Sequence, residues 1–109
     1  MSEWDARTEW VYLLANHKGG TLYVGSTSEL LLRLYEHRTG RGSKFVWKHE
    51  IFRLVWFEAV AGKAAALARE HAIKRWRREW KFELIEAMNP NWMDLTEEAS
   101  GVVGQEYRS

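Results

Sequence analysis

The fold is decided by residues 10–25, which have the sequence Trp10-Val11-Tyr12-Leu13-Leu14-Ala15-Asn16-His17-Lys18-Gly19-Gly20-Thr21-Leu22-Tyr23-Val24-Gly25. Strand-forming residues occupy 10–14 and 21–24, and the segment between them is rich in residues that favour turns. This pattern predicts a β-hairpin. Because side chains alternate between the two faces of a strand, the hairpin would place Tyr12 and Tyr23 opposite or nearly opposite each other on one face. The two phenols then either pack as a cross-strand pair or share a chemical site.

A helix that ends at about Arg38 is predicted directly after the hairpin. Ser26 and Glu29 have the spacing of a capping box, and the leucines that follow form an apolar stripe. Arg33 and His37 are separated by one helical turn, so they share one face of this helix. The helix therefore presents a cation and an imidazole together.

The rest of the chain is predicted to contain one more strand and a helical region. The strand covers about residues 53–60, and a helix follows from 63 to about 80. Residues 81–88 form its continuation or a separate short helix, which gives the element order β-β-α-β-α-α. Beyond residue 95 the apolar periodicity is lost, so residues 96–109 are expected to be a flexible tail.

The composition limits the class of protein. With 109 residues the chain is long enough for one domain. It contains no cysteine, so disulfides and thiolate metal sites are excluded, and a metal would need oxygen or imidazole ligands. No apolar run approaches the roughly 20 residues of a membrane helix, and residues 1–9 are polar and acidic, unlike a signal sequence. We expect a cytoplasmic protein without membrane association, in which residues 1–9 form an N-terminal extension.

Positive charge is concentrated in the middle of the sequence. Residues 33–81 contain 13 Lys or Arg against 5 Asp or Glu, and the remainder contains 3 against 10, although the net charge is only +1. Such a segment suits nucleic acid, because Lys and Arg contacts to phosphates supply most non-specific affinity. It is otherwise the solvated face of a helix. Among the seven tryptophans, Trp47 is the best placed to contact nucleic acid. The side chains predicted to bind nucleic acid are Arg38, Arg41, Lys44, Lys48, Lys74 and Arg78.

The order and spacing of these motifs resemble the GIY-YIG nuclease superfamily. Two motifs are the hairpin strands around Tyr12 and Tyr23. A third is Leu30-Leu31-Leu32-Arg33-Leu34-Tyr35-Glu36-His37, which matches the pattern L-x-x-R-L-x-x-H. The fourth is 69–78, which matches R-E-x-x-I-K-x-W-R-R and is followed by an N-P-x-W-x-D-L segment at 89–95. The likeness is to small stand-alone bacterial members and covers residues 10–95, which we take as the nuclease-like domain.

Two positions depart from the superfamily pattern. Trp10 replaces the first glycine of the G-I-Y motif, a change that the small stand-alone members tolerate. Ser26 stands where some members carry a lysine directly after the second motif. Activation of a base by that lysine is therefore in doubt, and Lys74 or His37 would have to substitute.

The resemblance implies an α+β fold, an α/β sandwich in which helices flank a three-stranded antiparallel sheet. It also implies a metal-dependent endonuclease that hydrolyses DNA phosphodiester bonds with weak sequence specificity and acts on branched or flapped DNA in repair or recombination. RNA is the less expected substrate. The alternative is a nucleic-acid binding module that keeps the nuclease fold, hydrolyses poorly and is targeted by a partner protein. The oligomeric state is left open.

Glu70 is the residue for which the sequence itself indicates a site. It shares a helical stripe with Ala66 and Ile73, so its carboxylate should face the sheet. A carboxylate in such a place needs a cation. That cation is either Lys74 at i+4 or a divalent ion, Mg²⁺ or Mn²⁺, which takes one or two carboxylates together with water and phosphate oxygens. The resemblance favours the metal.

The resemblance also implies roles for the residues around the hairpin. Tyr12 and Tyr23 would position or deprotonate the attacking water, and one of them would need a lowered pKa to act as a base. Arg33 would bind two phosphate oxygens with its guanidinium fork, or only pair with a neighbouring glutamate. His37 would accept the tyrosine proton, bind phosphate or be structural. The residues expected to support the site are Gly25 and Asn89.

Overall fold

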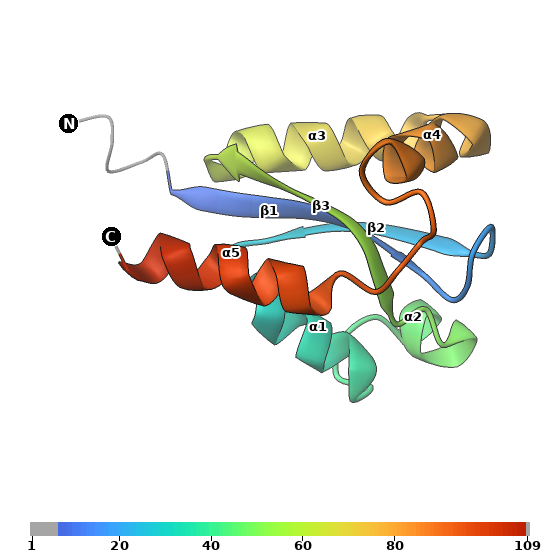
Figure 1. Ribbon diagram of the computed structural model, residues 1–109, viewed down its shortest axis with the longest axis horizontal. Helices are drawn as coiled ribbons and strands as arrows, with labels where there is room; N and C mark the ends of the chain where they lie inside the picture. The colour runs from blue at the N-terminus through green and yellow to red at the C-terminus, as the bar shows by residue number, and fades with distance from the viewer. Residues whose placement is uncertain (1–6, 109) are drawn as a thin grey trace.

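The computed structural model describes residues 7–108, and its elements are arranged around one sheet (Figure 1). In chain order they are β1 (Thr8–Ala15), β2 (Leu22–Thr27), α1 (Leu30–Arg38), α2 (Lys44–His49), β3 (Arg53–Ala61), α3 (Lys63–Arg75), α4 (Arg78–Met88) and α5 (Thr96–Arg108). The three strands are antiparallel and lie in the order β2-β1-β3. The predicted α+β class, the antiparallel sheet and the order of the predicted elements are confirmed.

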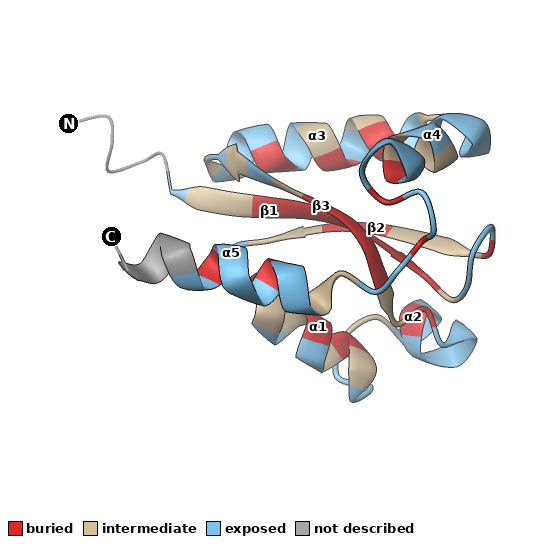
Figure 2. Cartoon of the chain, in the orientation of Figure 1, coloured by how far each residue is buried: buried red, intermediate tan, exposed pale blue. Residues whose placement is uncertain are grey.

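Helices cover both faces of the sheet, which explains why β1 is apolar along most of its length. The helices α3 and α4 lie on one face, whereas α1, α2 and α5 lie on the other (Figure 1). Alternate residues of β1 enter two separate cores: Val11 and Leu13 pack on the α3 side, and Trp10 and Tyr12 on the α1 side. Figure 2 shows the resulting buried stripe through the centre of the sheet.

A β-bulge interrupts the pairing of β1 with β3. Leu13 pairs with Trp56, but the next residue, Leu14, pairs with Leu54, so Val55 is the extra residue. As a result, Val55 and Trp56 both pack in the core on the α3 side. The carbonyl of Val55 accepts a hydrogen bond of 3.1 Å from Asn89 Nδ2, so a side chain satisfies the backbone group that the bulge displaces from the ladder.

Two helices were not predicted. Residues 44–49 form α2 inside the expected loop, and residues 96–108 form α5 where a flexible tail was expected. Ala99 and Val103 of α5 are buried in the core on the α1 side. The amide of Leu95 donates to the carbonyl of Leu54 at 2.7 Å, which anchors the start of α5 to β3. Docking of Ala99 and Val103 on this core therefore orders the segment.

Several predicted boundaries also differ. The strand β2 continues to Thr27, so α1 begins at Leu30, and Glu29 rather than Ser26 is its N-cap, without a side-chain capping bond. The expected capping box is absent because Ser26 is a strand residue. The strand β1 begins at Thr8 rather than Trp10, α3 ends at Arg75, and α4 is a separate helix. The rest of the predicted N-terminal extension, 1–6, lies outside the described residues. Within 7–108, no helix is long and apolar enough to cross a membrane.

Candidate functional site

The two hairpin tyrosines lie on the same face of the sheet, on a diagonal. Tyr12 pairs with Gly25, and Tyr23 pairs with Leu14, two positions along. Their ring centroids are 6.4 Å apart. Gly25 makes room for the Tyr12 ring: a β-carbon at position 25 would lie 2.5 Å from both Cζ and the hydroxyl oxygen of Tyr12. Any other residue at position 25 would therefore displace that phenol.

His37 completes a buried aromatic cluster with the tyrosines. Its Nε2 lies 2.9 Å from the Tyr12 hydroxyl, and its ring centroid is 5.2 Å from that of Tyr23. Either the phenol donates to Nε2 or an Nε2–H donates to the phenol oxygen. On the other side of the ring, Nδ1 has no hydrogen-bond partner among the described residues, and Gly42 packs closely against it.

Burial keeps both members of this contact neutral near pH 7. It raises the pKa of the Tyr12 phenol well above its ordinary value; Tyr23 adds to the rise and Arg33 opposes it. Burial also lowers the pKa of His37, and the charge of Arg33 lowers it further. His37 is therefore an uncharged imidazole that can take up a proton, whereas Tyr12 is a weak acid.

Arg33 projects from the first half of α1 and keeps much of its surface exposed. Its side chain is 43% accessible, and its Nε lies 3.6 Å from the Glu36 carboxylate. An exposed ion pair of this length contributes at most about 1 kcal/mol. Arg33 also lines an open pocket of about 210 Å³ together with Ser26, Thr27 and Lys63. Most of its donors are thus available to a ligand in that pocket.

Glu70 lies on the opposite face of the sheet and is nearly buried. Its Oε1 accepts a hydrogen bond of 2.5 Å from the Ser26 hydroxyl, and its Oε2 lies 2.5 Å from Lys74 Nζ. Burial alone would raise the pKa of Glu70, but the hydrogen bonds from Lys74 and Ser26 and the charges of Lys74 and His71 outweigh it, so the pKa is lowered. The carboxylate is therefore ionised. The salt bridge with Lys74, one of the two predicted alternatives, is present.

The edge strand β2 brings the two faces together. Ser26, which holds the Glu70 carboxylate, and Arg33 line the same pocket at the end of β2. The Tyr12 phenol also lies close enough for the charges of Arg33 and Glu70 to affect its pKa. Three of the predicted site residues, Tyr12, Arg33 and Glu70, thus surround one edge together with Ser26. From the sequence, Ser26 was interpreted as a helix cap. The alternation of side chains along β2 could have placed it correctly, because Leu22 and Val24 face α3 and Ser26 is the next residue on that face.

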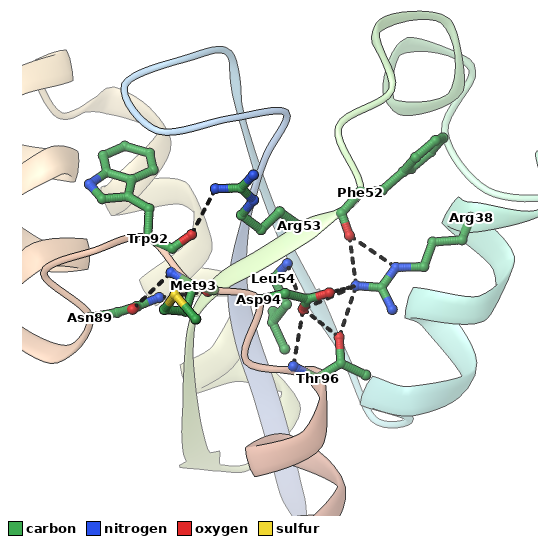
Figure 3. A network of polar contacts seen from close by, with 9 residues as sticks. All are labelled: Arg38, Phe52, Arg53, Leu54, Asn89, Trp92, Met93, Asp94 and Thr96. Atoms are coloured by element: carbon green, nitrogen blue, oxygen red, sulfur yellow. Dashed lines mark hydrogen bonds and ion pairs between the residues drawn. The ribbon is translucent and has the colours of Figure 1, made fainter.

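Three of the basic residues predicted to bind nucleic acid are engaged within the fold: Arg38, Arg78 and Lys74, the last of which is paired with Glu70. Arg38 donates to the Phe52 carbonyl at 2.6 and 2.9 Å and to the Thr96 hydroxyl at 2.9 Å, and it pairs with Asp94 at 3.4 Å (Figure 3). Arg78 donates to the carbonyls of Gly19 and Gly20, both at 2.7 Å. These guanidiniums fasten α1 to α5 and α4 to the hairpin, so they have fewer donors for phosphate. Arg41, Lys44 and Lys48 are exposed on the segment that follows α1.

Asn89 lies away from this edge. Its amide donates to the carbonyls of Val55 and Met93, and its oxygen accepts from the Met93 amide at 3.0 Å (Figure 3). Val55 belongs to β3, and β1 separates β3 from β2. These contacts make Asn89 a clamp between the bulge and the 89–93 turn.

Comparison with known proteins agrees with this geometry. Residues 8–83 match the model of the GIY-YIG catalytic domain. The chain belongs to the GIY-YIG family. The matched region contains both tyrosines, Arg33, His37 and Glu70.

Relatives of this GIY-YIG protein are small proteins from bacteria and archaea. A UPF0213 protein of Haloquadratum walsbyi is 41% identical over 66 residues, which cover 61% of this chain and 74% of the relative. One of Pseudomonas aeruginosa is 36% identical over 90 residues, covering 78% and 86%. The solution NMR structure of a UPF0213 protein of Bacillus halodurans superimposes with a TM-score of 0.51 at 29% identity, covering 83% of this chain and 95% of that one.

Proposed function

We propose that this protein is a divalent-metal-dependent endonuclease that hydrolyses DNA phosphodiester bonds. The observation that carries the proposal is the pocket at the end of β2, which is lined by both Arg33 and the serine bound to Glu70. A phosphate in this pocket would meet the guanidinium fork of Arg33 and the ammonium of Lys63, and the ionised carboxylate of Glu70 lies behind the Ser26 hydroxyl. Membership of the GIY-YIG family supports the same reaction class.

Arg33 is the phosphate ligand in this proposal. Its planar fork can bind two non-bridging oxygens at once, which a lysine ammonium cannot do. Lys63 lines the same pocket and adds positive charge. Because charge develops on these oxygens as water attacks, donors fixed at the pocket stabilise the transition state more than the ground state.

Glu70 fits the role of a ligand for a hard divalent ion. Among the side chains that the structure describes, no group of three or more acidic or histidine residues could enclose a metal, and in this proposal Glu70 is the one carboxylate that the protein supplies. Mg²⁺ and Mn²⁺ accept such sites because water and phosphate oxygens complete the coordination. The Lys74 ammonium neutralises the carboxylate in this structure and, with a 48% accessible side chain, is free to move away. When bound, the ion would act as a Lewis acid and neutralise phosphate charge.

The aromatic cluster would move the proton from the attacking water. Tyr12 is a poor base by itself because its pKa is raised, but its hydroxyl contacts the neutral imidazole of His37. The Tyr12 hydroxyl can pass its own proton to His37 Nε2 as its oxygen takes a proton from the water, so no isolated phenolate has to persist. Tyr23, packed against the His37 ring, would orient the water. Gly25 supports this arrangement by leaving room for the Tyr12 phenol.

The substrate range follows from the type of contact. Phosphate contacts position nucleic acid without reading its sequence. We therefore propose weak sequence dependence, with selection of branched or flapped DNA by shape, as needed in repair or recombination. RNA is the less favoured substrate. Arg41, Lys44, Lys48 and, once released from Glu70, Lys74 would supply further phosphate contacts.

A second candidate function is nucleic-acid binding with little hydrolysis, directed by a partner protein. The observation that favours it is the neutralised state of the site: Lys74 already occupies the carboxylate of Glu70, and Glu36 is paired with Arg33. A site that keeps these pairs when DNA binds would retain affinity but would not admit the metal. Hydrolysis of DNA by the purified protein separates the two functions.

The first test is Glu70→Gln, which keeps the shape of the side chain and removes its charge. We expect loss of cleavage of linear, nicked, flapped and branched DNA and loss of Mn²⁺ binding by calorimetric titration, because the ion loses its only protein carboxylate. The control is Glu83→Gln, an exposed glutamate on α4. Equal Mn²⁺ affinity in Glu70→Gln and wild type would make Glu70 a structural partner of Lys74.

The second test concerns the tyrosines. Tyr12→Phe and Tyr23→Phe should each lower the cleavage rate without unfolding the protein, because the packed rings remain. The double variant should be hardly slower than the poorer single variant, since groups that act as one unit give non-additive losses. Single-turnover rates on one flapped substrate measure this. Full activity in both single variants would mean that Tyr12 and Tyr23 only pack against each other and take no part in the reaction.

A further inference from the structure

The helix α2 combines exposed aromatic rings with positive charge. Val46 is its buried residue, whereas Phe45 is 47% and Trp47 51% accessible. Because successive helical residues are about 100° apart, Lys44 and Lys48 project on the side opposite Val46, and the two rings lie on the flanks. We call these four residues, Lys44, Phe45, Trp47 and Lys48, the α2 surface.

The two rings of the α2 surface pack against neighbouring residues of the protein. Gly40, with a φ of 81°, lies under Trp47, where an added β-carbon would be 3.3 Å from Cδ2 of the indole. The Phe52 ring supports the same indole at a centroid distance of 5.9 Å, and the His49 ring packs on Phe45 at 4.6 Å. An exposed ring that is already fixed loses little conformational entropy when a ligand stacks on it.

The α2 surface is joined directly to the candidate site. Residues 39–43 link the end of α1 to α2, and Gly42 in this link packs against the ring of His37. The helices α1 and α2 lie on the same side of the sheet (Figure 1). A strand of nucleic acid that runs from the pocket along α1 to its His37 end would therefore reach α2.

We propose that the α2 surface binds unpaired nucleotides of the substrate, with Phe45 and Trp47 stacking on bases and Lys44 and Lys48 contacting phosphates. This inference rests on the proposed function. Aromatic rings between cations are complementary to single strands, because unpaired bases expose their faces whereas a duplex hides them. The preferred substrate would then carry a single-stranded segment beside the bond that is cleaved.

A second exposed tryptophan provides the matched control. Trp80 on α4 is 48% accessible, nearly the same as Trp47. The guanidinium of Arg77 lies 5.5 Å from the centroid of the Trp80 ring, and the rings of Trp76 and Trp80 pack edge to face. The Trp80 ring therefore already makes a cation–π contact within the protein. Trp80 therefore controls for the general effect of removing an exposed indole.

The experiment measures binding of oligothymidine, oligouridine and a duplex of equal length by fluorescence anisotropy, without metal so that nothing is cleaved. Trp47→Leu keeps apolar bulk over Gly40 but removes the aromatic face. We expect oligothymidine binding to weaken about 5- to 100-fold, the range for loss of one stacked base. Trp47→Phe should restore most of the affinity. Duplex binding by Trp47→Leu should weaken less than oligothymidine binding, and every measurement on Trp80→Leu should stay within twofold of wild type.

Equal losses for single strand and duplex, or no loss in Trp47→Leu, would overturn the proposal. So would the same loss in Trp80→Leu. A larger loss with oligouridine than with oligothymidine would support the surface but assign it to RNA. A second measurement uses the wild-type protein and does not depend on a folded variant: photocrosslinking of an oligonucleotide that contains 5-iodouracil should label Phe45 or Trp47. Labels confined to other segments would count against the α2 surface even if the nuclease activity is real.

Discussion

The two halves of α1 each carry an arginine, and the two arginines have opposite environments. Arg38 is fixed by the Phe52 carbonyl, the Thr96 hydroxyl and the Asp94 carboxylate (Figure 3). Arg33, little more than one turn earlier, has one long ion pair and faces a pocket. The difference shows that the number of fixed acceptors, not the residue type or the helix, separates a structural guanidinium from one that can bind a ligand.

The largest expected effect is on chemistry at Arg33. Arg33→Lys should lower the single-turnover cleavage rate about 10²- to 10³-fold, the usual loss for one transition-state donor, because lysine keeps the charge but not the fork. DNA affinity should stay within a few fold, and the unfolding midpoint should not move. The control is Arg41→Lys, an exposed arginine in the next loop. Cleavage by Arg33→Lys at the wild-type rate would reduce Arg33 to a surface contact.

The opposite pattern is expected at Arg38. Arg38→Gln removes hydrogen bonds from a charged donor and leaves the Asp94 carboxylate without its cation, so it should reduce the free energy of unfolding by about 2–3 kcal/mol. Arg33→Gln, the matched variant, should change the free energy of unfolding by less than about 0.5 kcal/mol, as is usual for an exposed site. Urea titrations measure both. A stability loss in Arg33→Gln as large as that in Arg38→Gln would remove the distinction.

The smallest expected effect is on the pH dependence of stability through His37, which lies between the two arginines in sequence. Its pKa in the folded protein is below the ordinary value of 6.5. Below about pH 6.5 the unfolded chain therefore binds more protons than the folded one, so stability falls as the pH is lowered and is fully present above that value. For one proton the slope is at most about 1.4 kcal/mol per pH unit.

This pH effect also distinguishes the two arginines. Arg33 lowers the pKa of His37 more than Arg38 does. Arg33→Gln should therefore flatten the stability profile below about pH 6.5 more than Arg38→Gln, and His37→Gln should remove that part of the slope. His71→Gln, at an exposed position, is the control. An unchanged slope in His37→Gln would assign the pH dependence to another group.

Local periodicity in the sequence was enough to predict three features: the hairpin, the helix α1 and the inward position of Glu70. Tyr12 and Tyr23 share a face by alternation, and Glu70 lies on the buried stripe with Ala66 and Ile73. The engagement of Arg38 was not predictable from its neighbours. Its acceptors come from residues 52, 94 and 96, which only the tertiary fold brings to the end of α1.

The missed helix α5 has a similar cause. It contains Gly101 and Gly104, which are weak helix formers, and its buried contacts are made by small or medium side chains, Ala99 and Val103. Ala99 and Val103 are one helical turn apart, so a helical period is present, but the prediction of a tail gave more weight to the Glu, Gly and Ser content of the segment. The segment is ordered because Trp10 and the leucines of α1 leave an apolar surface on which it docks.

The close approach of Gly25 to the Tyr12 phenol restricts how this protein can evolve. A β-carbon at position 25 is compatible with the fold only if the side chain at position 12 becomes smaller. A smaller residue at position 12, however, removes the hydroxyl that contacts His37. The compensating substitution that rescues folding therefore abolishes the proposed proton path. Among descendants under selection for hydrolysis both positions should stay fixed, whereas in lineages that retain only binding they should drift together.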